Sequence, residues 1–306
     1  MLGFVTKRLL YSIATLFLLV LTVFLLVRAT GDPARVIAGA EATREEVAII
    51  RNELGLNRSL PVQFVDYIGD LVRGDFGRSF NFRQPVLDVY ADRLPRSLKL
   101  GAAAFVLSLA IGIPAGILSA VRPRGIGARL FKGVALLGVS VPNFVIATLF
   151  IYIFSIKLGW LPTSGSSSLK HLVMPAVALG WYFAAATMRL VQSSMLEVMR
   201  GEFIKLARLK GVPERLVVAK HALKNSLIPV ASLAGVNFVV MVNVAVVIEA
   251  IFAWPGIGDL VKVGIDQRDF PLVQGVVLLS GVMVVFVNLM LDVFYAWLDP
   301  RIRLAN

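Results

Sequence analysis

The chain has 306 residues, of which 58% are hydrophobic and only 16% are charged, and its mean hydropathy is +0.80. A soluble domain of this size does not need so much apolar surface. Six runs are long enough to cross a bilayer at about 20 residues each, so we predict an all-α membrane protein with six transmembrane helices. The net charge of +12 could indicate nucleic-acid binding, but basic cytoplasmic loops explain it without that partner. The absence of cysteine excludes disulfides and thiolate chemistry.

The first apolar run, Leu9 to Val27, follows Lys7 and Arg8. It resembles the start of a signal peptide, but the apolar part is too long and no convincing cleavage site follows it. We therefore interpret residues 1–27 as a cytoplasmic N-terminus and a retained first span.

Residues 28–99 form a polar segment with 11 Lys/Arg and 10 Asp/Glu, which we predict to be extracytoplasmic. Thr43 and Glu46 have the spacing of a capping box at the start of a helix, and Gly55 is placed to end that helix. Pro61 is placed to begin a second helix that ends at Gly74.

Residues 100–298 are predicted to form a five-span core, and residues 299–306 a cytoplasmic tail. The five spans are Leu100–Val121, Gly133–Ile156, Leu172–Met188, Leu227–Ile248 and Leu272–Leu291. Basic residues exceed acidic ones in the short loop 122–132, by four to none, and in loop 189–226, by eight to three. The two opposite loops carry two basic residues each. Six spans with both termini in the cytoplasm therefore satisfy the positive-inside rule.

Loop 189–226 contains the signals of two short helices that meet at a corner. Glu202 suits the first turn of one helix and Gly211 a left-handed stop, while Pro213 suits the first position of the next. Phe203, Leu206, Ala207 and Leu209 are predicted to form a partly apolar side. We predict that this corner docks a cytosolic partner; the alternative is a basic loop that serves only topology and lipid headgroups. The candidate docking residues are Glu202, Lys205, Ala207, Arg208, Lys210, Gly211, Pro213, Glu214, His221 and Asn225.

Polar side chains within spans are costly and are candidates for function. We predict that four asparagines line a polar path, although an interhelical hydrogen bond is the commoner role: Asn143, Asn237, Asn243 and Asn288. Glu249 and Asp292 lie near span ends, where a cap or an interfacial ion pair is expected. Prolines within or near the start of several spans are expected to bend their helices.

The sequence lacks the phosphate-binding loop of an ATPase, the paired histidines of a membrane zinc protease and the nucleophile elbow of a serine hydrolase. We therefore expect no catalysis, no cofactor and no metal site in this chain.

Several stretches together resemble one family. Ala207-Arg-Leu-Lys-Gly211, followed by His221-Ala-Leu-Lys-Asn225, resembles the EAA loop of ABC-importer permeases of the dipeptide/oligopeptide/nickel branch. The resemblance extends along the chain through Gly31-Asp-Pro33, Leu54-Gly-Leu56, Pro61-Val-Gln-Phe64, Gly74-Asp-Phe-Gly77, Trp160-Leu-Pro-Thr-Ser-Gly165, Glu249-Ala-Ile-Phe252, Trp254-Pro-Gly-Ile-Gly258, Arg268-Asp-Phe-Pro271 and Asp299-Pro-Arg-Ile-Arg303. Lys205, Leu206 and Lys224 depart from the general motif.

The resemblance implies a type I importer. In such an importer this chain pairs with a homologous second permease subunit in the lipid membrane. Two cytoplasmic ATPases bind ATP and magnesium and grip the coupling loop, and an extracytoplasmic solute-binding protein delivers cargo. Segment 28–99 and loop 254–271 would then face the binding protein, which implies a receptor-facing role for Asp75, Phe76, Trp254, Pro255, Gly256 and Asp269.

The branch handles dipeptides and oligopeptides, nickel, glutathione and oligosaccharides, and we expect a peptide. A self-sufficient secondary carrier or channel is the alternative from another class. It would transport solute when purified alone, whereas the permease would be inert without its ATPases. A membrane-embedded scaffold or enzyme is a third alternative, disfavoured by the missing catalytic motifs.

Overall fold

A computed structural model describes residues 2–30, 33–38, 42–53 and 55–298. The predicted tail and several motif residues (Gly31, Asp32 and Leu54) lie outside this part of the chain, as do the side chains of Asn243 and Asp292. The helices, with two π-helical turns named η1 and η2, are α1 (Leu2–Thr30), α2 (Pro33–Ala38), α3 (Arg44–Glu53), α4 (Leu60–Val72), α5 (Val86–Val121), α6 (Ile126–Ser140), α7 (Asn143–Phe150), η1 (Ile151–Lys157), α8 (Leu169–Met199), α9 (Glu202–Leu209), α10 (Glu214–Leu216), η2 (Val217–Ala222), α11 (Leu223–Ile251), α12 (Ile257–Asp266) and α13 (Phe270–Leu298).

Within the described residues, five helices are long and apolar enough to cross a membrane, and a bent pair of helices makes a sixth candidate span. The all-α membrane fold predicted from composition is therefore confirmed. The helices extend beyond the predicted apolar runs. For example, α5 begins at Val86 rather than Leu100, because a helix can continue past the membrane-spanning part of its sequence.

The bent pair corresponds to the predicted span Gly133–Ile156. Helix α6 ends at Ser140, and α7 begins at Asn143 at an angle of 110° to it. Pro142 lies at the break and the preceding Val141 is extended, as the ring of a following proline favours. The expected bend at this proline is thus large enough to interrupt the helix.

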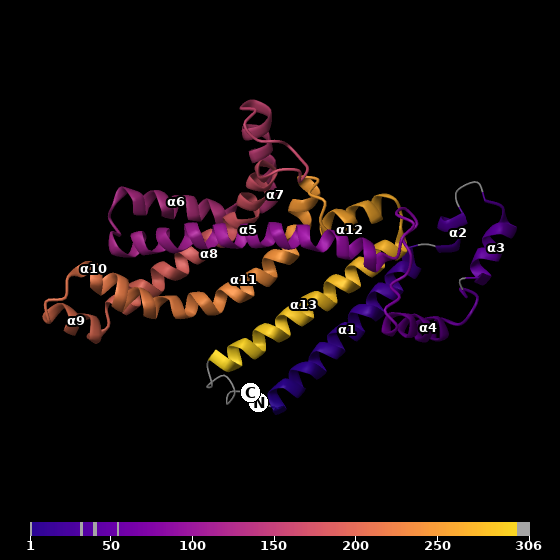
Figure 1. Cartoon of the computed structure of the whole chain (residues 1–306), viewed down its shortest axis with the longest axis horizontal. Helices are drawn as coiled ribbons and strands as arrows, with labels where there is room; N and C mark the ends of the chain where they lie inside the picture. Colours follow the sequence, from indigo (N-terminus) through magenta and orange to yellow (C-terminus); the bar gives the residue numbers. More distant parts are fainter. Residues whose placement is uncertain (1, 31–32, 39–41, 54, 299–306) are drawn as a thin grey trace. The chain divides into compact units, whose positions relative to one another are not determined.

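The chain divides into two compact units. The first comprises Met1–Pro95 and Gly256–Asn306. Figure 1 shows α1 and α13 of this unit alongside one another, running in opposite directions. A buried apolar cluster joins the start of α5 to α12 and α13 through residues such as Val86, Tyr90, Leu260 and Val276.

The second unit is Arg96–Pro255. Its main apolar cluster is built by α5, α7, α8 and α11. Small residues bring α5 and α8 together. A Cβ atom added at Gly116 would lie 2.6 Å from the Val191 side chain, and one at Gly112 would lie 2.8 Å from Thr187.

Candidate functional site

The predicted corner lies at one end of the second unit, where α9 and α10 connect α8 to α11 (Figure 1). Helix α8 ends at Met199, and α9 starts at Glu202 after the N-cap residue Gly201. Glu202 is in the first turn, where the helix dipole favours an anion, and it accepts a hydrogen bond from Lys205 Nζ at 2.7 Å.

The turn between α9 and α10 depends on Gly211, whose φ of +75° lies in the left-handed region. The Val212 N–H donates to the Ala207 carbonyl at 3.2 Å and the Gly211 N–H to the Arg208 carbonyl at 3.0 Å, which satisfies the last carbonyls of α9. Pro213 is the N-cap of α10, one residue before its predicted place at the first helical position. The predicted stop and turn are otherwise as expected.

The apolar residues of α9 point in two directions, which corrects the single apolar side predicted from the sequence. Ile204, which the prediction omitted, is completely buried in a cluster with residues of α8 and η2. Ala207, one turn later, packs against the same cluster. Phe203, Leu206 and Leu209 are instead 46%, 57% and 83% exposed, and they recur every third residue along the helix. We call these three residues the outer stripe.

The two short helices are joined by an ion pair that the sequence did not reveal. Arg208 donates from Nε to Glu214 Oε2 at 3.0 Å and from Nη2 to Oε1 at 2.7 Å. This two-point geometry fixes orientation as well as distance. The hydrogen bonds lower the pKa of Glu214 and raise the pKa of Arg208 from their usual values.

The remaining docking candidates lie around this corner. Lys210 is exposed at the end of α9. His221 is half-buried in η2, and the exposed Asn225 donates from Nδ2 to the His221 carbonyl at 2.8 Å. Helix α10, η2 and α11 follow one another without an interruption, so the second short helix of the prediction is the first turn of a long one.

The four asparagines proposed to line a polar path come from three helices, α7, α11 and α13. Asn143 is half-buried in the first turn of α7, directly after the 110° bend. Asn237 is half-buried in α11, and Asn288 is exposed on α13, which belongs to the other unit. Their pore-lining role stays a prediction.

Glu249 is almost fully buried near the end of α11. Its expected role as a cap or an interfacial ion pair stays a prediction. Its backbone carbonyl accepts a hydrogen bond from the Trp254 N–H at 2.9 Å, which helps to close the turn after the helix.

Two of the predicted receptor-facing residues are interior residues. Trp254 is 1% exposed and donates from Nε1 to the Arg96 carbonyl at 3.0 Å. Asp269 is equally buried, and its carboxylate accepts hydrogen bonds from Ser79 Oγ at 2.6 Å, the Asn81 N–H at 3.0 Å and the Leu272 N–H at 3.1 Å. Their burial corrects the expectation that these side chains face outward, because each one orders a loop from within.

The other four residues of that group are more varied. Asp75 is exposed and accepts a hydrogen bond from the Gly77 N–H at 2.8 Å. Phe76 packs partly against the core of the first unit. Pro255 is half-buried and Gly256 is buried. Asp75 is therefore the member of the group best placed to meet another molecule.

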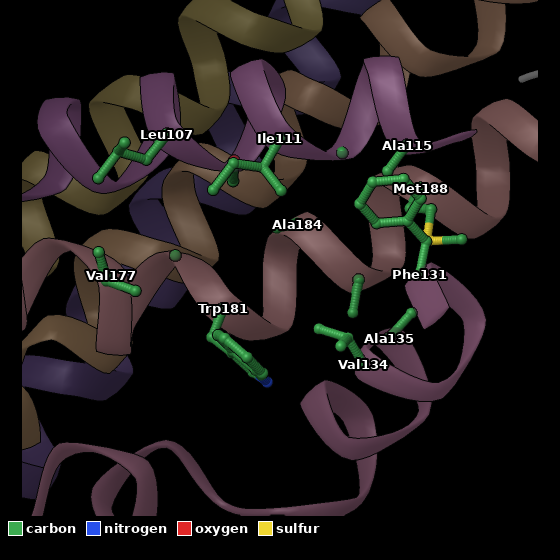
Figure 2. Close-up of a pocket in the computed structure, with 14 residues that line it drawn as sticks. Leu107, Ile111, Ala115, Phe131, Val134, Ala135, Val177, Trp181, Ala184 and Met188 are labelled. Carbon is green, nitrogen blue, oxygen red and sulfur yellow. The ribbon is translucent and has the colours of Figure 1, made fainter. Parts of the chain in front are cut away.

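A partly open cavity of about 100 Å³ lies between α5, α6 and α8 (Figure 2). Its walls are mainly apolar side chains such as Leu107, Ile111, Phe131 and Trp181, and none of its lining residues is charged. Ser108 is among the lining residues, but its hydroxyl already donates to the Phe105 carbonyl at 2.8 Å. The charged termini of a peptide would find no partner there, so this cavity does not suit a peptide cargo.

Comparison with known proteins identifies the chain. Residues 112–304 match the family described as "Binding-protein-dependent transport system inner membrane component". Residues 1–101 match the N-terminal domain of the same family. The chain belongs to this family. It is 40% identical over 304 residues to the glutathione transport system permease protein GsiC of Escherichia coli strain K12 and to that of Shigella flexneri serotype 5b, covering 99% of each chain.

Solved structures place this permease in the type I ABC importer fold. An inward-facing structure of the MetNI methionine ABC transporter aligns with a TM-score of 0.58 at 19% identity, covering 70% of this chain and 97% of that one. An amino acid ABC transporter with histidines aligns with a TM-score of 0.54 at 16% identity, covering 68% and 93%. The chain is therefore a multi-pass permease subunit of a binding-protein-dependent ABC importer, as the sequence resemblance predicted.

Proposed function

We propose that the corner from α9 to η2 is the surface through which two cytoplasmic ATPases drive this permease. The observation that supports this most directly is that the apolar side chains of α9 point in two directions. Ile204 anchors the helix in its own unit, while the outer stripe of Phe203, Leu206 and Leu209 is exposed. Arg208 and Glu214 hold the outer stripe at a set angle to the rest of the corner.

Such a surface suits an apolar groove in a partner protein. Exposed large apolar side chains grouped on a rigid helix are typical of docking sites, and the surrounding lysines and arginines can guide an acidic partner. In this proposal the chain forms half of the translocation pore with a homologous second permease. ATP and magnesium are bound by the ATPases, and hydrolysis takes place there rather than in this chain.

The proposed orientation follows the distribution of charge in the short loops. The corner, loop 122–132 and both termini face the cytoplasm, because these short loops carry the excess of Lys and Arg. Segment 28–99 and loop 254–271 face the opposite side, where a solute-binding protein delivers its cargo.

We further propose that the cargo is a dipeptide or a short oligopeptide, with glutathione as the leading candidate. The support is the 40% identity, over almost the full length, to permeases named for glutathione transport. The binding protein makes most of the selection in such importers, so the test begins with the solute-binding protein encoded beside this chain. Ligand binding to that protein should favour glutathione or dipeptides over nickel and oligosaccharides, and a preference for either of the latter would contradict the assignment of cargo.

The coupling proposal is tested at Gly211, using the complete importer reconstituted in proteoliposomes. A Cβ atom at this position meets no atom within 4 Å, so the effect of a substitution comes from the backbone conformation and not from crowding. Gly211→Val should break coupling, because a β-branched residue strongly disfavours a φ of +75°. Gly211→Asn is the matched control, because asparagine tolerates the left-handed region.

We expect Gly211→Val to lower uptake per ATP hydrolysed at least fivefold, with Gly211→Asn close to the native protein. Coupled transport that is unchanged in Gly211→Val would contradict the proposal. Solute uptake by the purified chain without ATPases or nucleotide would contradict it as well, and would favour the secondary-carrier alternative.

A further inference from the structure

Helix α4 carries two apolar faces, and the described chain covers one of them. Phe64, Tyr67, Ile68 and Leu71 are half-buried on the covered face. Val62, Val65 and Val72 lie on the next face around the helix and are 44%, 67% and 82% exposed. At 3.6 residues per turn these two faces are adjacent, and together they cover more than half of the circumference.

The remaining side of α4 is acidic. Asp66 and Asp70, one helical turn apart, point to this side and are more than half exposed. Asp66 forms an ion pair with Arg58 at 2.9 Å, and Arg73 lies 4.0 Å from Asp70. A broad apolar arc opposite a narrow charged edge is the pattern of a helix that lies in the surface of a membrane.

Contacts with α1 determine the depth at which α4 lies. The Phe64 ring packs edge-on against Phe17 at 5.9 Å and Phe24 at 5.0 Å, measured between ring centroids. Both partners belong to the apolar span Thr6–Ala29. At 1.5 Å per residue, Phe24 and Phe17 lie roughly 8 Å and 18 Å along the helix axis from Ala29.

The hydrocarbon core of a bilayer is about 30 Å thick. The Phe64 ring therefore lies at the depth of the leaflet nearest to Ala29, and not above the membrane. Because the covered face of α4 packs against α1 at this depth, the neighbouring valine face contacts the same surroundings as α1.

We propose that α4 is a membrane-interface helix whose outer valine face contacts the acyl chains of that leaflet, while Asp66 and Asp70 point toward the headgroups. Lipid is the occupant that fits best, because the exposed valines continue the apolar surface of a transmembrane helix at its own depth. The charged edge with its arginine partners suits the polar boundary of the same leaflet. The segment after the first span is thus partly a membrane anchor, and this inference does not depend on the identity of the cargo or on ATPase docking.

The chain contains no cysteine, so single cysteines can be introduced without removing native ones. Val65→Cys and Val72→Cys report the valine face, and Asp66→Cys and Asp70→Cys are the matched positions on the acidic edge. Each variant is labelled with a small fluorophore in the complete importer, reconstituted in phosphatidylcholine vesicles. Brominated phosphatidylcholine then quenches labels that touch acyl chains, and aqueous iodide quenches labels that touch water.

We expect brominated lipid to quench the labels at Val65 and Val72 at least twofold more than those at Asp66 and Asp70, with iodide showing the reverse order. Equal iodide quenching at all four positions would overturn the proposal in favour of a solvated helix. Labels at Val65 and Val72 that neither agent quenches would overturn it in favour of a protein partner. If the importer that carries Val65→Cys does not assemble, a label at Val62→Cys reports the same face of α4.

Discussion

Arg208 of α9 donates two hydrogen bonds to the carboxylate of Glu214 in α10, across the turn that Gly211 makes possible. Ile204 is buried in the apolar cluster of the corner and fixes the position of α9. The Arg208–Glu214 pair fixes the angle at which the outer stripe is presented.

The Arg208–Glu214 pair should weaken in acid. Its hydrogen bonds lower the pKa of Glu214 in the folded protein, so the stabilisation is present above the unfolded-state pKa and is lost as pH falls through the folded-state value. Both side chains are well exposed, so the effect should be at most about 1 kcal/mol. A spin label at Leu209→Cys should become more mobile between about pH 5 and pH 3.

The control for this titration is Glu214→Gln, which removes the titrating group. The label should be mobile in this variant already at neutral pH, and acid should change its mobility much less. A native corner that stays rigid at pH 3 would show that the ion pair does not hold it.

Ile204 and Leu206 should give opposite results when each is changed to alanine. Ile204→Ala leaves a cavity in a closed cluster and should destabilise the protein by about 2–4 kcal/mol, because the side chain is completely buried. Leu206→Ala should change stability by less than about 0.5 kcal/mol, since the side chain is largely exposed. Thermal unfolding of the purified permease measures both effects. If the coupling proposal holds, Leu206→Ala should nevertheless weaken binding of the ATPase subunits in a pull-down titration.

Asp269 should be essential for the order of the segment around Ser79. Asp269→Ala leaves the hydroxyl of Ser79 and the N–H groups of Asn81 and Leu272 without their buried acceptor, at a cost of roughly 2–4 kcal/mol. Asp266→Ala is the matched control, because it removes only the exposed pair with Lys262 and should leave stability almost unchanged. Limited proteolysis should cut residues 77–86 faster in the first variant alone, and equal cutting would refute this role.

Close packing of α5 against α8 should make Gly116 intolerant of any side chain. Gly116→Ala would place its Cβ atom 2.6 Å from the Val191 side chain and 2.7 Å from the Met188 carbonyl oxygen, so we expect a loss of about 1–3 kcal/mol. Gly133→Ala in α6 meets no atom within 4 Å and should stabilise its helix by up to about 1 kcal/mol. Unfolding temperatures of the two variants should therefore move in opposite directions.

Local signals in the sequence predicted local structure well. Thr43 and Glu46 form the expected capping box, in which the Thr43 N–H donates to Glu46 Oε2 at 2.7 Å and the Glu46 N–H to Thr43 Oγ1 at 3.3 Å. Gly55, Gly74 and Gly211 all adopt the positive φ expected where their helices stop. These features depend on a few neighbouring residues, so the chain itself contains the information that specifies them.

Features that depend on contacts between distant residues could not be predicted from the sequence in the same way. Periodicity placed Leu206 and Ala207 on one side of α9, but burial is decided by α8 and η2, which cover Ile204 instead. The family resemblance implied that Trp254 faces the binding protein, whereas the packing of its own unit encloses the side chain. The Arg208–Glu214 contact requires the turn at Gly211 to be closed first, and spacing alone did not reveal it.

The two sides of the corner differ in how they join the membrane helices. On the α8 side, Arg200 and Gly201 interrupt the helix, so that connection is a joint. On the other side, α10, η2 and α11 follow one another without a break from Glu214 to Ile251, with Pro229 inside α11. We therefore expect a displacement of the corner to be taken up by rotation at the first connection and transmitted along the second. It should then reach the far end of α11, beside the turn that the Trp254 N–H closes.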